Sequence, residues 1–216
     1  MDKARGVLLW AMAVIGGAAC LLQVYLNMTG HLDHTPLWRL GEYVSYFTNT
    51  TGLLATAVAI AALVRPASSL AQPGAVTATA VYILVVAVTY EWLLKRETHG
   101  LQSLANLGLH RVLPTLTVLL WLATPKAGLS WREPLAWLAY PAAYMAWILA
   151  RGATIHRYPY FFADVDKLGY PRALLNGADF LLTFYVLGLA AVAIGRIPLT
   201  RTFPFRFGPK AANPEA

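Results

Sequence analysis

The sequence is poor in charged residues, on which soluble domains depend. Charged residues make up 12% of its 216 residues, while 58% are hydrophobic, and the mean hydropathy is +0.53. Soluble domains usually carry about 25% charged residues. The composition excludes an ordinary soluble domain and predicts an all-α, polytopic membrane protein.

Cysteine is almost absent, because Cys20 is the only one. A disulfide framework and a cysteine-rich metal site are therefore both excluded. Acidic residues are also few: 10 Asp and Glu stand against 17 Lys and Arg, which gives a net charge of +7. The basic residues are scattered singly or in pairs, which favours a membrane surface over nucleic acid as the partner.

Histidine pairs with metal-ligand spacing are missing too. Four histidines lie outside the apolar segments and none forms an i, i+4 pair: His31, His34, His99 and His156. Within the apolar segments only His110 occurs, whereas a haem-binding electron carrier needs pairs of histidines. We therefore expect neither a metal nor a cofactor.

Long apolar runs are what the sequence does contain. Six are apparent, at residues 6–28, 43–64, 74–94, 104–124, 133–150 and 172–195. Each is close to the roughly 20 residues that a membrane helix needs. The first has a basic start and small residues before Cys20, like a lipoprotein signal, but it continues to Met28 and is better explained as a retained span. We expect a bundle of six transmembrane helices at residues 1–196.

The connections suggest an orientation and one functional loop. Nine Lys and Arg fall on the side of the two termini and seven on the other side, which weakly favours cytoplasmic termini. A basic, Pro-rich tail at 197–216 is expected to be interfacial or disordered, and the piece HTPLWRLGEY to lie flat in the interface. The connection RYPYFFADVDKLGYP is too aromatic for an idle linker.

The fourth apolar run, LANLGLHRVLPTLTVLLW, contains Asn106, His110, Arg111 and Pro114. Each polar group in hydrocarbon must find a protein or water partner, so such residues are functional candidates. Pro114 is expected to kink the helix beside His110. Arg111 is expected to reach the interface and to pair with Glu91, in preference to binding a substrate carboxylate.

Alternate spans place polar residues at one depth. Spans two, four and six begin on the same side, and a rise of about 1.5 Å per residue puts their polar groups roughly 6–10 Å inside one interface. In span two these groups are Thr48, Asn49, Thr50 and Thr51, in span four Asn106 and His110, and in span six Asn176 and Asp179. Glu91 lies at the end of span three, on the same side of the membrane. The sequence predicts that they converge in one pocket.

A hydroxyl, an imidazole and a carboxylate are the parts needed for nucleophilic acyl transfer. A threonine hydroxyl needs a neighbouring base, and a third group usually fixes the tautomer of the histidine. Asp179 or Glu91 could supply that group. The same residues have structural explanations: membrane threonines and asparagines commonly bond backbone or neighbouring helices, and His110 could be a packing histidine.

A transporter is the main alternative function. In it Asp179, His110, Arg111 and Glu91 would form a proton or ion relay. No inverted repeat accompanies these residues, which disfavours a transporter. A non-catalytic scaffold is also open.

Three motifs carry a resemblance to a known family. YFTNTTGLL opens span two, NLGLHRVLP opens span four, and RYPYFFADVDKLGY leads into the last span. In this order they resemble bacterial relatives of the androgen-induced-gene and androgen-dependent TFPI-regulating proteins. The resemblance implies a six-span membrane threonine hydrolase of a bacterial inner membrane, which takes a fatty acid ester of a hydroxy fatty acid, or a similar lipid, from the bilayer.

The resemblance implies a role for each matched residue. Thr48 would be the nucleophile and His110 the general base. In the mechanism that we expect from these two residues, Asn49, Asn106 or backbone amides stabilise the oxyanion. Arg111 is a possible anchor for the liberated carboxylate. Leu107 and Gly52 depart from the family pattern, and a shifted register would make Thr50 or Thr51 the nucleophile.

Overall fold

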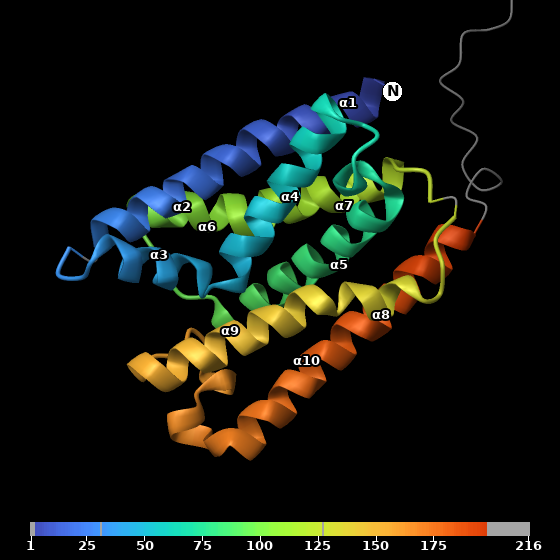
Figure 1. Ribbon diagram of the computed structural model, residues 1–216. Helices are drawn as coiled ribbons and strands as arrows, with labels where there is room; N and C mark the ends of the chain where they lie inside the picture. Colours follow the sequence, from blue (N-terminus) through green and yellow to red (C-terminus); the bar gives the residue numbers. More distant parts are fainter. Residues whose placement is uncertain (1–2, 31, 127, 198–216) are drawn as a thin grey trace, which may run out of the picture.

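The computed structural model describes residues 3–30, 32–126 and 128–197, and no strand occurs among them. Long helices lie side by side along one direction, and the amino terminus and the end of the last helix lie at the same end of the molecule (Figure 1). The predicted tail at 197–216 falls, apart from Ile197, outside the described residues.

Four of the described helices are long and apolar enough to cross a membrane. They are Lys3–Gly30, Phe47–Val64, Pro73–Leu94 and Val165–Arg196. In element order these are α1 (Lys3–Ala11) with the π-helical turn η1 (Met12–Gly16) and α2 (Gly17–Gly30), α4 (Phe47–Val64), α5 (Pro73–Thr89) with the π-helical turn η3 (Tyr90–Leu94), and α10 (Val165–Arg196). A polytopic membrane protein is therefore supported, but six spans are not.

The fourth predicted span is helical but is not one of these four. It consists of α6 (Gly100–Leu107), the π-helical turn η4 (Gly108–Val112) and α7 (Leu113–Ala123). Pro114 cannot donate to the carbonyl four residues before it. The expected disturbance beside His110 takes the form of this π-helical turn, a feature that often marks functional sites.

The fifth predicted span is divided into α8 (Glu133–Trp137) and α9 (Ala139–Ile155). Pro141 has no amide hydrogen for the carbonyl of Trp137, so the helix is interrupted there. Tyr82 of α5 donates to that carbonyl instead, at 2.6 Å. The interruption therefore leaves a carbonyl free for a hydrogen bond that joins α5 to the α8–α9 segment.

Short elements connect the long helices. The piece expected to lie in the interface forms α3 (Pro36–Val44), whose start is capped by the Thr35 hydroxyl, which accepts from the Trp38 amide at 3.3 Å. The 3₁₀ turns η2 (Ser69–Ala71) and η5 (Phe161–Ala163) lie in later connections. At Gly169 the chain bends within α10, with φ of 72°, a conformation that favours glycine.

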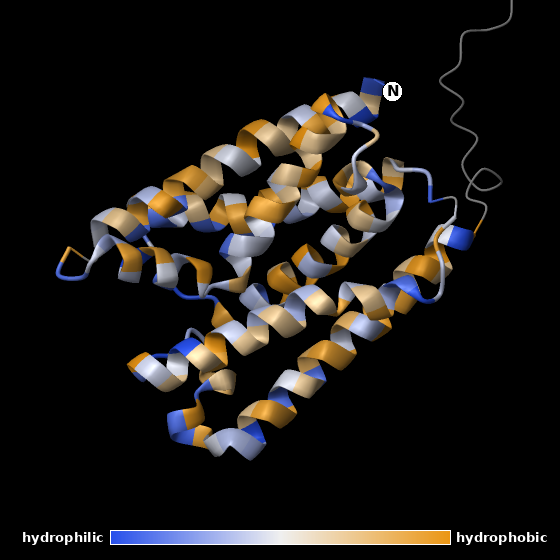
Figure 2. Cartoon of the chain, in the orientation of Figure 1, coloured by the Kyte–Doolittle hydropathy of each residue, from blue (hydrophilic) through white to orange (hydrophobic). Residues whose placement is uncertain are grey.

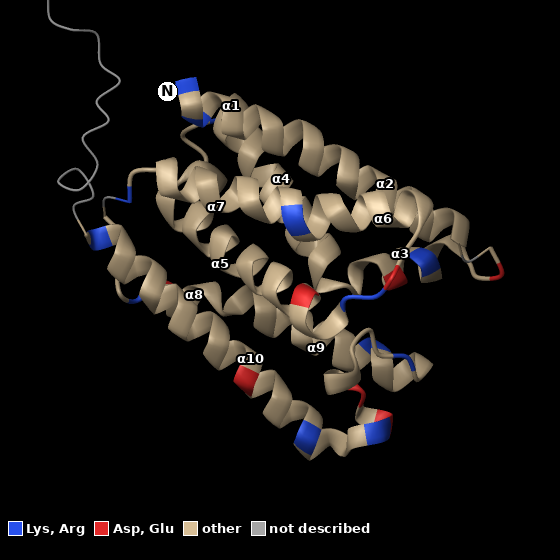
Figure 3. Ribbon diagram, turned by 180° about the vertical axis from the view of Figure 1, so that it is seen from behind, with Lys and Arg blue, Asp and Glu red and all other residues tan. Residues whose placement is uncertain are grey.

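Packing forms two hydrophobic clusters that meet along α4 and α5. One lies among α1, η1, α2, α4, α5, η4 and α7, and the other among the start of α4, α5 and the α8–α10 segments. Figure 2 shows hydrophobic residues along the helices, and Figure 3 shows most charged residues toward the helix ends and connections. The second cluster borders the candidate active site.

Gly108 allows α2 and η4 to approach closely. A Cβ atom built on Gly108 would lie 2.7 Å from the Cβ of Ala19, too near for two carbon atoms. Small residues at such contacts are typical of membrane helices. At Gly52, one of the departures from the family pattern, a Cβ would lie 3.0 Å from Leu109 and 3.3 Å from Cys20, so a larger residue has little room.

We expect Gly108→Val to destabilise the protein by about 1–3 kcal/mol, the usual cost of overpacking a filled interior. Thermal unfolding in detergent micelles measures the effect. Gly30→Val is the matched control, because a Cβ on Gly30 meets nothing within 4 Å. Equal melting temperatures for the two variants would contradict this account of the contact.

Candidate active site

Thr48 lies at the start of α4, in the second helical residue. Tyr46 has an extended backbone and precedes the helix, which begins at Phe47. The Thr48 Oγ1 atom lies 3.2 Å from Nε2 of His110, which the π-helical turn η4 presents from the fourth predicted span. Both side chains are half-buried. The structure therefore brings the two residues predicted as nucleophile and base into contact.

The other nitrogen of His110 defines the tautomer. Nδ1 lies 3.2 Å from the backbone carbonyl oxygen of Asn106. A carbonyl oxygen only accepts hydrogen bonds, so Nδ1 carries the proton and Nε2 is left with a lone pair. Thr48 then donates its hydroxyl proton to Nε2, which is the arrangement that a general base requires.

Tyr90 fixes the plane of the His110 ring. The two rings are stacked, with centroids 3.7 Å apart and planes inclined by 17°. Tyr90 lies in the π-helical turn η3 and His110 in η4, so both stacked residues come from locally widened helix turns. The contact limits rotation of the imidazole away from Thr48.

The neighbouring threonines face another helix. The Tyr140 hydroxyl of α9 lies 2.8 Å from Oγ1 of Thr50 and 3.0 Å from Oγ1 of Thr51. The Tyr140 hydroxyl therefore joins α9 to the start of α4. Of the threonines in YFTNTT, only Thr48 contacts His110 within the described residues.

Asp179, predicted to orient His110, is not near it. Its side chain is exposed on α10, and Asn176 one turn earlier donates to the Phe162 carbonyl at 2.7 Å. Counting residues along a helix does not predict which way a side chain faces, and the Asp179 side chain is exposed. The group beside Nδ1 of His110 is instead the Asn106 carbonyl.

Glu91, the other predicted orienting carboxylate, is bound to cations. Its Oε1 lies 2.6 Å from Nε of Arg111 and its Oε2 lies 3.0 Å from Nζ of Lys95. The expected pairing of Arg111 with Glu91 is present. Arg111 is therefore occupied and does not face the polar cavity as a free anchor for a carboxylate.

The two asparagines predicted to stabilise an oxyanion use their amide groups elsewhere. Nδ2 of Asn49 donates to the Tyr43 carbonyl at 2.9 Å, and Nδ2 of Asn106 donates to Oγ1 of Thr98 at 3.1 Å. Gln102 in turn donates to Oδ1 of Asn106 at 3.0 Å. Both asparagines line the polar cavity, but their contacts are structural.

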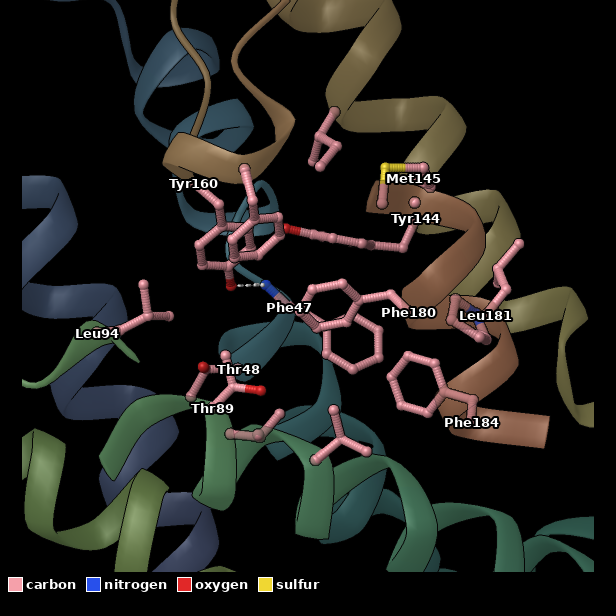
Figure 4. A pocket seen from close by; sticks show the side chains of 16 residues that line it. Phe47, Thr48, Thr89, Leu94, Tyr144, Met145, Tyr160, Phe180, Leu181 and Phe184 are labelled. Atoms are coloured by element: carbon pink, nitrogen blue, oxygen red, sulfur yellow. Dashed lines mark hydrogen bonds between the residues drawn. The ribbon is translucent and has the colours of Figure 1, made fainter. Parts of the chain in front are cut away.

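Two cavities meet at Thr48. A polar cavity of about 380 Å³ contains His110, Asn49 and Asn106, and is also lined by Gln23, Asn27, Glu42, Arg96 and Gln102. A narrower cavity of about 50 Å³ is lined almost entirely by apolar and aromatic side chains from α4, α5, α9 and α10 (Figure 4). Three residues line both: Thr48, Leu94 and Tyr160. Thr48 therefore lies between a polar and an apolar cavity.

Tyr90 and Tyr160 are site residues that were not identified individually from the sequence. The only signal for Tyr160 was the aromatic pattern of its connection, and Tyr90 gave none, because an aromatic residue at a span end is usually an interfacial anchor. Among the described residues, no cluster of His, Cys, Asp or Glu could hold a metal ion.

Comparison with known proteins adds no identification, since no family model, curated protein or solved structure matches the chain. The function must therefore be argued from the geometry of the site.

Proposed function

We propose that the protein is an integral-membrane hydrolase that cleaves a lipid ester, with Thr48 as the nucleophile and His110 as the general base. The observation that carries this proposal is the Thr48–His110 contact of 3.2 Å, with the Asn106 carbonyl behind the imidazole. The constellation of hydroxyl, base and orienting group is shared by many nucleophilic hydrolases.

Acylation follows from the position of the two side chains. Oγ1 of Thr48 attacks the ester carbonyl carbon as its proton passes to Nε2 of His110, which gives a tetrahedral intermediate and an imidazolium. The carbon–oxygen bond to the leaving alcohol then breaks, and the imidazolium returns the proton to that oxygen. The acyl group remains as an ester on Thr48.

Deacylation uses water from the polar cavity. His110 removes a proton from a water molecule, whose oxygen attacks the acyl carbon. Collapse of the second tetrahedral intermediate returns the proton to Thr48 and releases the carboxylic acid. The cavity of about 380 Å³ beside His110 has ample room for this water.

The apolar cavity would receive the acyl side of the substrate. Its volume of about 50 Å³ is small beside the roughly 150 Å³ that accommodate benzene in an engineered cavity. An acyl chain would extend it by displacing flexible side chains such as Met145, since methionine repacks readily. The chain would enter from the bilayer.

Membership of the androgen-induced-gene and androgen-dependent TFPI-regulating family is part of this proposal. It includes six spans, with α6–α7 and α8–α9 crossing beside the four long helices, a bacterial inner membrane, and termini in the cytoplasm. Fatty acid esters of hydroxy fatty acids are the proposed substrates. The motifs YFTNTTGLL and NLGLHRVLP support it, because they supply the two contacting residues.

The transporter alternative gains no support from the contacts. Its relay needs Asp179 beside His110, whereas Asp179 is exposed on α10. Arg111 and Glu91 pair with each other, at a partly exposed site. We therefore retain hydrolysis as the single proposed function.

A fluorophosphonate probe tests the nucleophile. Oγ1 of Thr48 should attack its phosphorus, with loss of fluoride, because His110 accepts the hydroxyl proton. We expect purified membranes to give one labelled peptide, modified at Thr48 by mass spectrometry. Thr48→Ala should abolish labelling.

Thr50→Ala is the matched control, because Thr50 has the same hydroxyl two residues away but contacts Tyr140. It should label like the wild type. Full labelling of Thr48→Ala, or modification of a different residue, would overturn the proposed mechanism.

A further inference from the structure

Tyr160 places a hydroxyl group next to the proposed nucleophile. It lies just before η5, its side chain is 8% exposed, and it lines both cavities together with Thr48. The Phe47 amide donates to its hydroxyl oxygen at 3.1 Å (Figure 4). Since Phe47 directly precedes Thr48, this bond fixes the phenol at the start of α4.

Stacking holds the Tyr160 ring in place. It is parallel to Phe162, with centroids 5.0 Å apart and an angle of 9°, and Phe162 is stacked on Phe180 of α10 at 4.7 Å. Tyr46 packs edge-on against Tyr160 at 6.2 Å. The hydroxyl is therefore held before any substrate arrives, as electrostatic catalysis requires.

The hydroxyl proton of Tyr160 is available for donation. The Phe47 amide is itself a donor, so that bond uses only the oxygen of Tyr160. Burial raises the pKa of Tyr160 to about 12, although the nearby Thr48 and Tyr144 hydroxyls and the Phe47 amide partly oppose the rise. The phenol therefore keeps its proton at neutral pH.

Neighbouring side-chain donors each have a partner, although each asparagine amide keeps a second hydrogen. The Tyr144 hydroxyl donates to the Ser45 carbonyl, and the amide groups of Asn49 and Asn106 donate to other partners. The backbone amide of Thr48 remains, because the first amides of a helix have no carbonyl partner within that helix. It also lies at the positive end of the α4 dipole.

From these contacts we infer that the Tyr160 hydroxyl and the Thr48 amide form the oxyanion hole of the reaction. When Oγ1 of Thr48 adds to the ester carbonyl, the π electrons move to the carbonyl oxygen, and Tyr160 donates a hydrogen bond to that oxyanion without transferring its proton. Collapse of the intermediate restores the carbonyl. This inference depends on the proposed hydrolase function.

The test is steady-state hydrolysis of a p-nitrophenyl acyl ester and of its thionoester by Tyr160→Phe. Removal of one oxyanion donor usually costs about 10²–10³-fold in kcat. We expect a loss of that size for the oxygen ester with little change in KM. The thionoester should lose much less, because sulfur is a weak hydrogen-bond acceptor. A purely structural role would reduce both rates equally, and that result would overturn the inference.

Tyr82→Phe is the matched control, since it removes a buried hydroxyl from the same aromatic cluster, one that donates to the Trp137 carbonyl and lines neither cavity. It should keep the wild-type ratio of ester to thionoester rates. Thr48→Ala separates the two proposals: if it is inactive while Tyr160→Phe is fully active, the hydrolase stands and the oxyanion assignment fails. If Thr48→Ala hydrolyses at the wild-type rate, the proposed function itself fails.

A fluorinated tyrosine at position 160 covers the case in which Tyr160→Phe does not fold. It keeps both the hydroxyl donor and the acceptor for Phe47, but fluorine lowers the pKa of the phenol. The donor is lost as pH rises through that pKa, so kcat should decline at a lower alkaline pH than in the wild type. An alkaline limb at the wild-type position would contradict the inference.

Discussion

Replacing His110 by glutamine is expected to reduce ester hydrolysis by about 10²–10⁴-fold, the range that a positioned general base contributes. Glutamine can still accept a hydrogen bond from Thr48, but its amide is too weak a base to remove the hydroxyl proton. The fall should appear in kcat, since the cavity walls that bind substrate remain. Hydrolysis of a p-nitrophenyl ester by protein in nanodiscs measures it.

The double variant Thr48→Ala with His110→Gln should be about as slow as Thr48→Ala alone. Residues that act as one unit are strongly non-additive, because the base has no function without its nucleophile. His156→Gln is the matched control: His156 is exposed and 3.0 Å from Asp166, remote in role from the site. Wild-type kcat in His110→Gln would exclude general base catalysis by this residue.

The sequence was sufficient to predict which residues of spans two and four lie at a common level. Helix rise fixes depth, so counting from the span ends placed Thr48, Asn106 and His110 at one level, and the structure joins all three. The types of the side chains predicted the contact itself, because a threonine and a histidine at one depth in hydrocarbon have few other hydrogen-bond partners. The catalytic roles given to them remain proposals.

The direction of side chains could not be predicted in the same way. Asp179 is exposed on α10, and a count of residues along a helix predicts depth but not the direction in which a side chain points. Each π-helical turn adds a residue to the helix and rotates the residues after it. His110 and Tyr90 both lie in such turns, so their stacking was beyond prediction.

Contacts between distant segments were also missed. Tyr160 reaches Phe47 across 113 residues of sequence through an irregular connection, and no local pattern specifies its path. The division of the fifth predicted span shows the same limit. Pro141 predicts an interruption of the helix, but the hydrogen bond from Tyr82 to the Trp137 carbonyl depends on tertiary packing, which the local sequence does not specify.

A buried ion pair gives the largest stability effect that we expect. Glu42, 6% exposed at the end of α3, lies on the wall of the polar cavity. Its Oε2 is 3.0 Å from Nη2 of Arg151 on α9, and its Oε1 is 3.7 Å from Nη2 of Arg157. The first pair is close but poorly oriented for a hydrogen bond, so charge attraction dominates. Both arginines also lie over the ring of Trp38.

Arg151→Met is expected to destabilise the protein by about 3–5 kcal/mol, because it leaves the Glu42 carboxylate buried with only a distant cation. Thermal unfolding in detergent micelles measures the loss. Arg157→Met should cost less than about 1 kcal/mol, since the Arg157 side chain is 53% exposed and water screens its charge.

The double variant Glu42→Met with Arg151→Met separates charge from packing. Replacing both members of a buried pair by apolar residues removes the desolvation cost together with the attraction, and is often neutral. We therefore expect it to recover most of the stability lost in Arg151→Met. If the double variant is as unstable as the single one, the arginine stabilises α9 through its contact with Trp38, and not through Glu42. Recovery would establish that the ion pair joins α3 to α9 at the wall of the polar cavity, which keeps Glu42 from facing the proposed nucleophile as an unpaired charge.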